Sequence, residues 1–126
     1  MKKLLILISA FFFLVSFQTS KNIDEVITSI KSGNSTQLSS YFDNTIEITL
    51  SEKSNSYSKN QAEIVMRDFF ALHQVRNFEV LHKGENVGSQ YCIGTLTTKN
   101  GIFRTTVYLK QKGDRQLLQE IRFEIN

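Results

Sequence analysis

The second half of the chain alternates between apolar and polar residues over four consecutive segments. These segments lie near residues 76–83, 90–98, 102–111 and 116–125, are rich in β-branched and aromatic residues, and are separated only by short turn signals. Strands joined by such short turns run antiparallel, and one face of the resulting sheet needs a cover. The pattern therefore predicts a four-stranded antiparallel meander packed against a second layer.

Three helical segments precede the meander and can supply that layer. The first helix is marked by apolar residues at i, i+3, i+4 and i+7, a short helix capped by Ser35 follows, and a long helix runs from Ser58 to near His73. The apolar faces of the three helices are Ile23, Val26, Ile27 and Ile30, then Leu38, Tyr41 and Phe42, then Ala62, Val65, Met66, Phe69 and Phe70.

One further strand lies before the long helix. Ile46, Ile48 and Leu50 alternate with polar residues, whereas residues 51–56 are polar throughout and are interpreted as an exposed loop. The predicted order is helix, helix, strand, helix and four strands. This order belongs to the α+β class, with three helices from the N-terminal half on one face of an antiparallel sheet.

The hairpin loops assign residues to the two faces of the sheet. A two-residue loop at Asn100-Gly101, of the type that needs positive φ at both positions, pairs Ile93 with Tyr108. The face toward the helices then carries Cys92, Gly94, Leu96, Phe103, Val107 and Leu109. The outer face carries Tyr91, Ile93, Thr95, Thr97, Arg104, Thr106, Tyr108 and Lys110.

The last turn is predicted to have an odd number of residues. A two-residue loop at Gly113-Asp114 would turn Glu120, Arg122 and Glu124 toward the helices, and burying these charges is costly. A three-residue loop over 113–115 instead turns the apolar set inward, namely Ile121, Phe123 and Ile125. Gly94, in the middle of a strand, suits a bend or a bulge.

Residues 1–20 have the layout of a secretory signal peptide. Lys2 and Lys3 precede an apolar run from Leu4 to Val15, and a less apolar stretch follows. The run is shorter than the roughly 20 residues of a membrane span, and no cysteine follows it to carry a lipid, so no stable membrane anchor is expected. The expected domains are a signal peptide over 1–20 and a single α+β domain over 21–126, in a protein that is exported, either periplasmic or secreted.

Composition narrows the classes of partner. Without Lys2 and Lys3 the chain has 13 basic and 12 acidic residues, a net charge of +1, and no basic cluster, so no nucleic-acid partner is expected. The only cysteine, Cys92, cannot form an internal disulfide and is interpreted as a small buried residue rather than a reactive thiol. The six phenylalanines after residue 20 are expected to fill much of the core.

The segments Lys83–Asn86, Gly88–Leu96 and Leu118–Glu124 are similar to a family of small exported proteins of Gram-negative bacteria, domain of unknown function 4783. The order of elements resembles the wider nuclear-transport-factor-two-like (cystatin-like) superfamily, in which a curved sheet wraps round helices as a cone. The resemblance covers essentially all of 21–126. It implies export and a cone-like fold, with no activity, ligand or catalytic motif to carry over. The superfamily implies two places for function, namely the interior of the cone and the outer sheet face, through which dimers form.

The interior offers few groups for chemistry. His82 alternates with Phe78 and Val80 and is expected to point inward, whereas Asp68 lies off the apolar stripe of its helix, so neither histidine has an inward carboxylate beside it. Many large inward residues predict a filled cone with a small pocket at most. The candidate lining of a pocket for a small apolar ligand is Tyr41, Phe69, His73, His82, Cys92 and Gln119.

The expected function is therefore binding or interaction without catalysis, with no catalytic residue, no cofactor and no metal site. The alternative is small-molecule binding or an isomerase- or cyclase-like enzyme in the interior. On the outer face, a homodimer interface would use Tyr91, Ile93, Thr95, Arg104, Thr106, Tyr108 and Arg122. A solvated outer face is the alternative there, because antiparallel sheets often have one.

The N-terminal pattern predicts export with removal of residues 1–16 at least and 1–20 at most. N-terminal sequencing of the protein isolated from its own host measures this directly, and we expect the first residue to fall between Phe17 and Lys21. A protein that keeps Met1 and remains in the cytoplasm would contradict the prediction.

Overall fold

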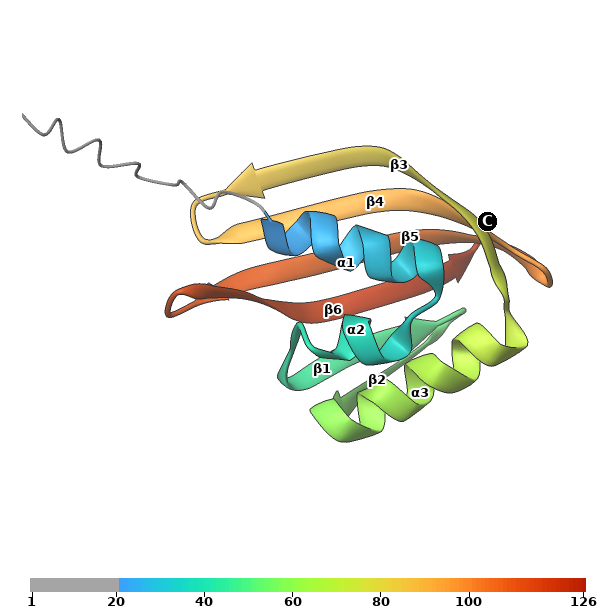
Figure 1. Cartoon of the computed structure of the whole chain (residues 1–126), viewed down its shortest axis with the longest axis horizontal. Coiled ribbons are helices and arrows are strands. Elements are labelled where there is room, and N and C mark those ends of the chain that lie inside the picture. Colours follow the sequence, from blue (N-terminus) through green and yellow to red (C-terminus); the bar gives the residue numbers. More distant parts are fainter. Residues whose placement is uncertain (1–20) are drawn as a thin grey trace, which may run out of the picture.

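The computed structural model describes residues 21–126, so the expected signal peptide lies outside the described residues. Three helices and one six-stranded sheet form two layers (Figure 1). The helices are α1 (Lys21–Ser32), α2 (Ser35–Ser39) and α3 (Lys59–Leu72). The strands are β1 (Phe42–Leu50), β2 (Lys53–Ser58), β3 (Val75–Asn86), β4 (Ser89–Thr98), β5 (Gly101–Lys112) and β6 (Arg115–Ile125).

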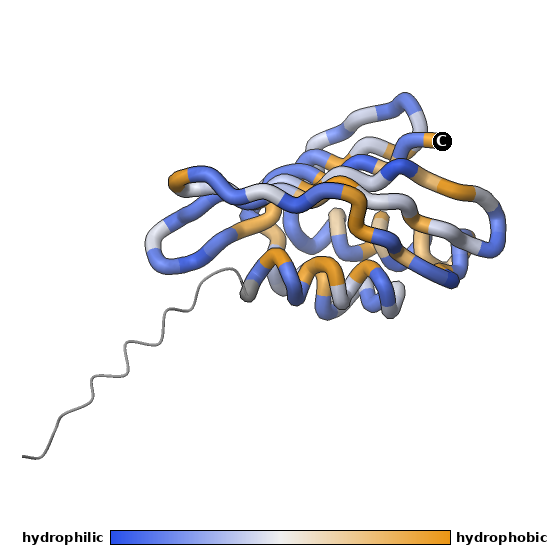
Figure 2. Tube along the Cα trace, turned by 90° about the horizontal axis from the view of Figure 1, so that it is seen from above, coloured by the Kyte–Doolittle hydropathy of each residue, from blue (hydrophilic) through white to orange (hydrophobic). Residues whose placement is uncertain are grey.

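The strands lie in the order β2-β1-β6-β5-β4-β3. All neighbours are antiparallel except β1 and β6, which run parallel and are separated in the chain by α3 and the four strands β2, β3, β4 and β5. Figure 2 shows the three helices on one side of the curved sheet, with the other side uncovered. The predicted α+β class, with helices against one face of a curved sheet, is confirmed.

Apolar residues of both layers meet in one continuous core. All six phenylalanines of the described chain are buried, as expected from their number in a domain without disulfides. The helix α1 contributes the predicted stripe from Ile23 to Ile30, and every residue of that stripe is at most 7% exposed. Helix ends follow local capping: Ser58 caps α3 by accepting from the Gln61 amide at 3.3 Å, and Asn34, rather than the predicted Ser35, caps α2.

The expected loop over residues 51–56 is wrong, because residues Lys53–Ser58 form the edge strand β2. A two-residue turn at Ser51-Glu52 pairs Leu50 with Lys53, and Ser51 adopts a φ of 60° to close it. All of β2 except Tyr57 is exposed. An edge strand with this exposure shows no apolar alternation in the sequence, since it is held to β1 mainly by backbone hydrogen bonds, with one side-chain bond of 2.6 Å between the Thr49 and Ser54 hydroxyls.

The β4–β5 hairpin turns one residue earlier than predicted. Its turn is Lys99-Asn100, so that Ile93 pairs with Thr106 and not with Tyr108, and Gly101 has positive φ whereas Asn100 does not. The register differs from the prediction by two residues. Because side chains alternate with a period of two, the predicted faces are unchanged.

In the β5–β6 hairpin the predicted loop length is wrong, although Ile121 and Phe123 face the core as predicted. Its loop is the two-residue Gly113-Asp114 that the sequence analysis rejected, since Lys112 pairs with Arg115. A β-bulge at Gln119 then skips one residue between the Leu109–Leu118 and Tyr108–Glu120 pairs. The bulge restores Ile121 and Phe123 to the core, as predicted.

The predicted inward face of β6 is only partly covered. Ile125 pairs with Phe103 and so shares the face of the core, yet 72% of Ile125 is exposed because it lies at the open end of the sheet. The helices do not extend over this end of β6.

A second bulge, at Leu81 in β3, lies beside Gly94. Val80 pairs with Gly94, and the next pair joins His82 to Ile93. A Cβ on Gly94 would lie 2.6 Å from the Glu79 carbonyl oxygen and 2.7 Å from the Phe78 ring. The absence of a side chain thus lets β3 bend across β4, which confirms the interpretation of Gly94.

Gly94→Ala is expected to destabilise the protein by about 2–3 kcal/mol, because the new methyl group overlaps backbone and a buried ring. Urea unfolding followed by circular dichroism measures the change. The control is Gly88→Ala, where nothing lies within 4 Å and only the positive φ of 82° costs about 1 kcal/mol. Equal stability of the two variants would contradict the packing role of Gly94.

Candidate functional site: the open end of the sheet

A cavity of about 590 Å³ opens at the end of the sheet where α3 ends. We call this cavity the mouth. Its apolar lining is Leu50, Val65, Phe69, Leu72, Ile102, Phe103 and Ile125. Its other lining residues are Ser51, Tyr57, Asp68, His73, Asn100 and Gly101. Figure 1 shows the C-terminal ends of α3 and β6 and the β4–β5 turn at this same end of the molecule.

Hydrogen bonds between distant segments hold the walls of the mouth together. The Asn100 amide nitrogen Nδ2 donates to the Leu72 carbonyl at 2.6 Å, and the Lys99 backbone amide donates to the Gln74 carbonyl at 2.9 Å. These two bonds tie the β4–β5 turn to the C-terminus of α3. On the other side, the Ser51 amide donates to the Phe123 carbonyl at 2.8 Å and fixes the β1–β2 turn beside β6.

The floor of the mouth is aromatic. The Phe69 ring stacks on Phe123 with centroids 4.4 Å apart and meets Phe103 edge to face at 5.3 Å. The His73 ring lies 4.7 Å from Phe69 and 5.0 Å from Phe103. Such packed rings form a rigid apolar base, because each ring is fixed by its neighbours.

Two polar groups of the mouth have no partner among the described residues. The His73 nitrogen Nδ1 is buried without a hydrogen bond, although most buried polar atoms are paired. Asp68 is exposed and makes no hydrogen bond or ion pair within residues 21–126. Asp68 and His73 line the same cavity without a hydrogen bond between them.

Of the six candidate pocket residues, Phe69 and His73 lie in the mouth. Tyr41 lies elsewhere, and its hydroxyl donates to the Glu25 carboxylate of α1. Burial, together with this carboxylate, raises the pKa of Tyr41 to about 12. Tyr41 therefore joins α1 to the start of β1.

Cys92 is fully buried in the core and lies opposite Lys83 in the pairing of β3 with β4. Burial raises the pKa of its thiol to about 11. Above it, the Lys83 ammonium forms a 2.8 Å ion pair with Asp24 of α1. Cys92 does not line the mouth.

The expected inward orientation of His82 is wrong. The bulge at Leu81 shifts the alternation of β3 by one residue, so His82 pairs with Ile93 and lies on the outer face. There its Nε2 forms a 2.7 Å hydrogen bond with the Tyr91 hydroxyl. The Tyr91 ring in turn covers Gly84, where a Cβ would lie 2.2 Å from the ring.

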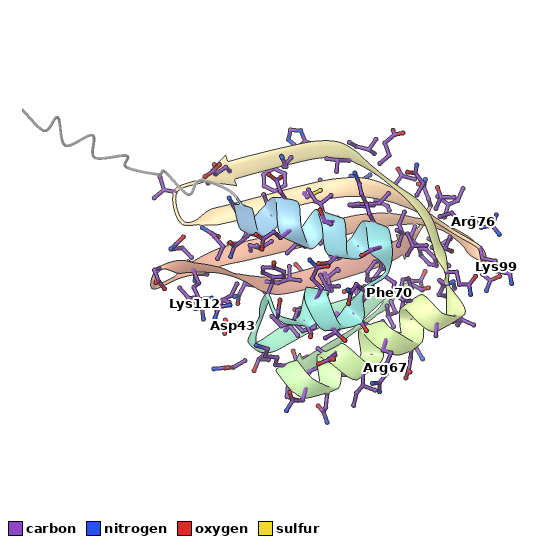
Figure 3. The ribbon with its side chains drawn as sticks, viewed as in Figure 1. Asp43, Arg67, Phe70, Arg76, Lys99 and Lys112 are labelled. Atoms are coloured by element: carbon purple, nitrogen blue, oxygen red, sulfur yellow. The ribbon has the colours of Figure 1, made fainter. Side chains whose placement is uncertain are left out.

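Gln119 lies at the β6 bulge, in the half of the strand that is farther from the mouth. Its Nε2 donates to the Asp43 carboxylate at 2.9 Å, and Lys112 forms a 2.9 Å ion pair with the same carboxylate. Figure 3 shows Asp43 and Lys112 side by side at this end. Lys112 and Gln119 lower the pKa of Asp43 to about 2, so its carboxylate anchors the bulge to β1.

The seven candidate interface residues all lie on the outer face, where the alternation of β4, β5 and β6 places them. They form a contiguous patch, because Tyr91 pairs with Tyr108, Ile93 with Thr106, and Arg122 with Thr106 across the next strand. Every one of them is at least partly exposed. A homodimer through this patch stays a prediction.

Most residues of the mouth were not predicted from the sequence. Asp68 was set aside because it lies off the buried stripe of α3, yet Val65, Asp68 and Leu72 follow at i, i+3 and i+7 and form a second stripe. That spacing was a usable signal for one wall. Ser51 and Asn100 lie in turns, and Tyr57 lies in the edge strand β2. These segments come together only in the tertiary structure.

Residues 21–126 contain neither a cluster of metal ligands nor a membrane-spanning helix. No group of three or more His, Cys, Asp or Glu in this part of the chain is arranged to hold a metal ion. No helix in the same range is long and apolar enough to cross a membrane.

Known proteins share the fold of this chain. Residues 23–124 match the family model described as domain of unknown function DUF4783. A DUF4783 family protein from Bacteroides uniformis is 32% identical, with a TM-score of 0.80 over 82% of this chain and 95% of that one. A second, from Bacteroides ovatus, is 34% identical, with a TM-score of 0.78 over 81% and 93%.

A more distant structure confirms the superfamily fold. A putative dehydratase of the NTF2-like family from Streptomyces avermitilis is 10% identical, with a TM-score of 0.63 over 82% of this chain and 91% of that one. At this identity the likeness shows the fold alone. None of the curated proteins compared with the chain matches it.

Cys92 is expected to resist thiol reagents in the folded protein. A pKa of about 11 leaves roughly one thiol in a thousand ionised at pH 8, and the side chain is fully buried. Reaction with Ellman's reagent at pH 8 should therefore be at least about a hundredfold slower than in urea-unfolded protein. Labelling of folded protein at the unfolded rate would place the thiol at an accessible site instead.

Proposed function

The chain belongs to the DUF4783 family, and we propose that it is an exported protein that binds a small, mainly apolar molecule in the mouth. The N-terminal pattern of Lys2, Lys3 and the apolar run from Leu4 to Val15 supports export. The lining of the mouth supports the ligand class. Neither the family model nor the solved members of the family give a function that can be assigned to this chain.

The observation that carries the proposal is an apolar cavity whose rim is also apolar. Its volume of about 590 Å³ lies within the roughly 300–1,000 Å³ of small-molecule sites. Around it, Leu72 is 64% exposed, Ile102 47% and Ile125 72%, from three separate elements. A bound apolar molecule would remove these side chains from water, which is the main source of affinity in such sites.

The predicted filled interior is consistent with this location. Phe70, Phe78 and Phe123 occupy the space between the layers, so the cavity lies at the open end and not in the middle of the cone. The mouth is nevertheless larger than the small pocket expected from the sequence.

Binding without turnover accounts for the polar groups better than catalysis does. General acid–base catalysis needs a positioned pair of titratable groups. The titratable side chains of the mouth are Tyr57, Asp68 and His73. Within residues 21–126, no hydrogen bond orients Asp68 or the His73 Nδ1. The putative dehydratase with this fold is too dissimilar in sequence to lend its activity.

Leu72→Ser is expected to weaken binding of dodecanol about tenfold. Burying a leucine side chain contributes about 1.5–3 kcal/mol, and 1.4 kcal/mol corresponds to a factor of ten. Displacement of the neutral dye Nile red, followed by fluorescence, measures the affinity. Leu72 is already 64% exposed in the free protein, so folding should be unaffected.

The matched control is Ile64→Ser, on the same helix. Ile64 is 48% exposed and does not line the mouth, so its replacement removes a similar apolar group from another face of α3. Equal loss of affinity in both variants, or no saturable binding by the unmodified protein, would contradict the proposed function.

A further inference from the structure

The mouth has a distinctive charge as well as an apolar lining. Among the lining residues that belong to the described range 21–126, Asp68 is the only Asp, Glu, Lys or Arg. The carboxylate is exposed and has no hydrogen bond or ion pair to any residue of the described chain. An apolar cavity edged by a single free carboxylate favours a ligand with a complementary positive charge.

The adjoining surface supplies no net charge that offsets Asp68. An adjoining hollow shares Leu50, Ser51 and Ile125 with the mouth, and its charged residues are Glu52, Glu124 and Lys53. Glu124 is paired with Arg122 at 3.5 Å, and the negative charge of Glu52 is balanced in number by the positive charge of Lys53. The charge of Asp68 in the mouth has no such counterpart. Within residues 21–126, then, no cation lines the cavity to neutralise Asp68.

Two basic residues lie near this end but outside the lining. Figure 3 shows Arg76 and Lys99 at the same end of the molecule, at its periphery. Neither residue lines the mouth. A ligand held in the mouth therefore meets the Asp68 carboxylate along the lining, and neither of these basic side chains.

We propose that the ligand is a cationic amphiphile, an aliphatic chain or ring that bears a protonated amine. Its apolar part would pack on the Phe69 and Phe103 rings, and its ammonium group would pair with Asp68. This inference rests on the proposed function, because it specifies the chemistry of a molecule held in the same cavity. A charge-assisted pair at the edge of an apolar site adds both affinity and orientation.

Three probes of equal chain length test the inference: dodecylamine, dodecanoate and dodecanol, each below its micelle concentration at pH 7.5. Displacement of Nile red reports all three affinities. We expect dodecylamine to bind at least about tenfold more tightly than dodecanoate, with dodecanol between them. The preference should shrink as salt is raised, because ions screen an exposed carboxylate.

Asp68→Asn should reduce the preference for the amine over the acid to less than about threefold. The matched control is Asp114→Asn, which removes the same charge from the exposed β5–β6 turn and should keep the full preference. Melting curves by circular dichroism confirm that both variants are folded.

The outcomes separate the two proposals. If dodecanol binds but dodecylamine gains nothing over dodecanoate, the mouth binds apolar molecules and the cationic inference is overturned. If Asp68→Asn keeps the preference for the amine, the assignment to Asp68 is overturned. If none of the three probes binds, the proposed function itself fails.

Discussion

The inner face of the long strands must stay toward the helices wherever the helices cover the sheet, and β-bulges make this possible. Two of these bulges matter most, because β3 bends and because the two-residue β5–β6 turn would reverse the alternation of β6 if nothing corrected it. The bulge at Gln119 returns Ile121 and Phe123 to the core after a two-residue turn. The bulge at Leu81 bends β3 across β4, where Gly94 leaves room. Core, curvature and outer face all depend on these two corrections.

The sequence predicted the faces well and the backbone route poorly, for one physical reason. Burial selects which side chains point inward, so Phe103, Val107 and Phe123 could be assigned from hydrophobicity alone. A bulge is harder to place, because one extra residue in a strand shifts the alternation just as one extra residue in a turn does. The error at His82 follows directly, since the prediction continued the alternation of Phe78 and Val80 to His82, whereas Val80 and Leu81 are consecutive apolar residues and the strand bulges there. The edge strand β2 was missed because exposed polar residues pair through their backbones.

The candidate site was harder to predict than the fold, because it forms where four separate segments end. Phe69 and His73 were expected from the stripe of α3, and they form the floor of the mouth. The walls come from two turns and from the end of β6, joined by contacts such as that between Asn100 and the Leu72 carbonyl. The sheet extends past its helical cover at this end, which leaves apolar residues exposed around a cavity. Function is therefore inferred at the place where the packing of the two layers stops.

In our proposal a small molecule binds at this open end of the sheet and not on its outer face. Titration of ¹⁵N-labelled protein with dodecanol, followed by two-dimensional amide NMR, tests it directly. The account predicts saturable shifts concentrated at the amides of Ser51, Leu72, Gly101 and Ile102, with the amides of Ile93 and Thr106 unmoved. Shifts centred on Ile93 and Thr106, or no saturable shifts at all, would contradict it.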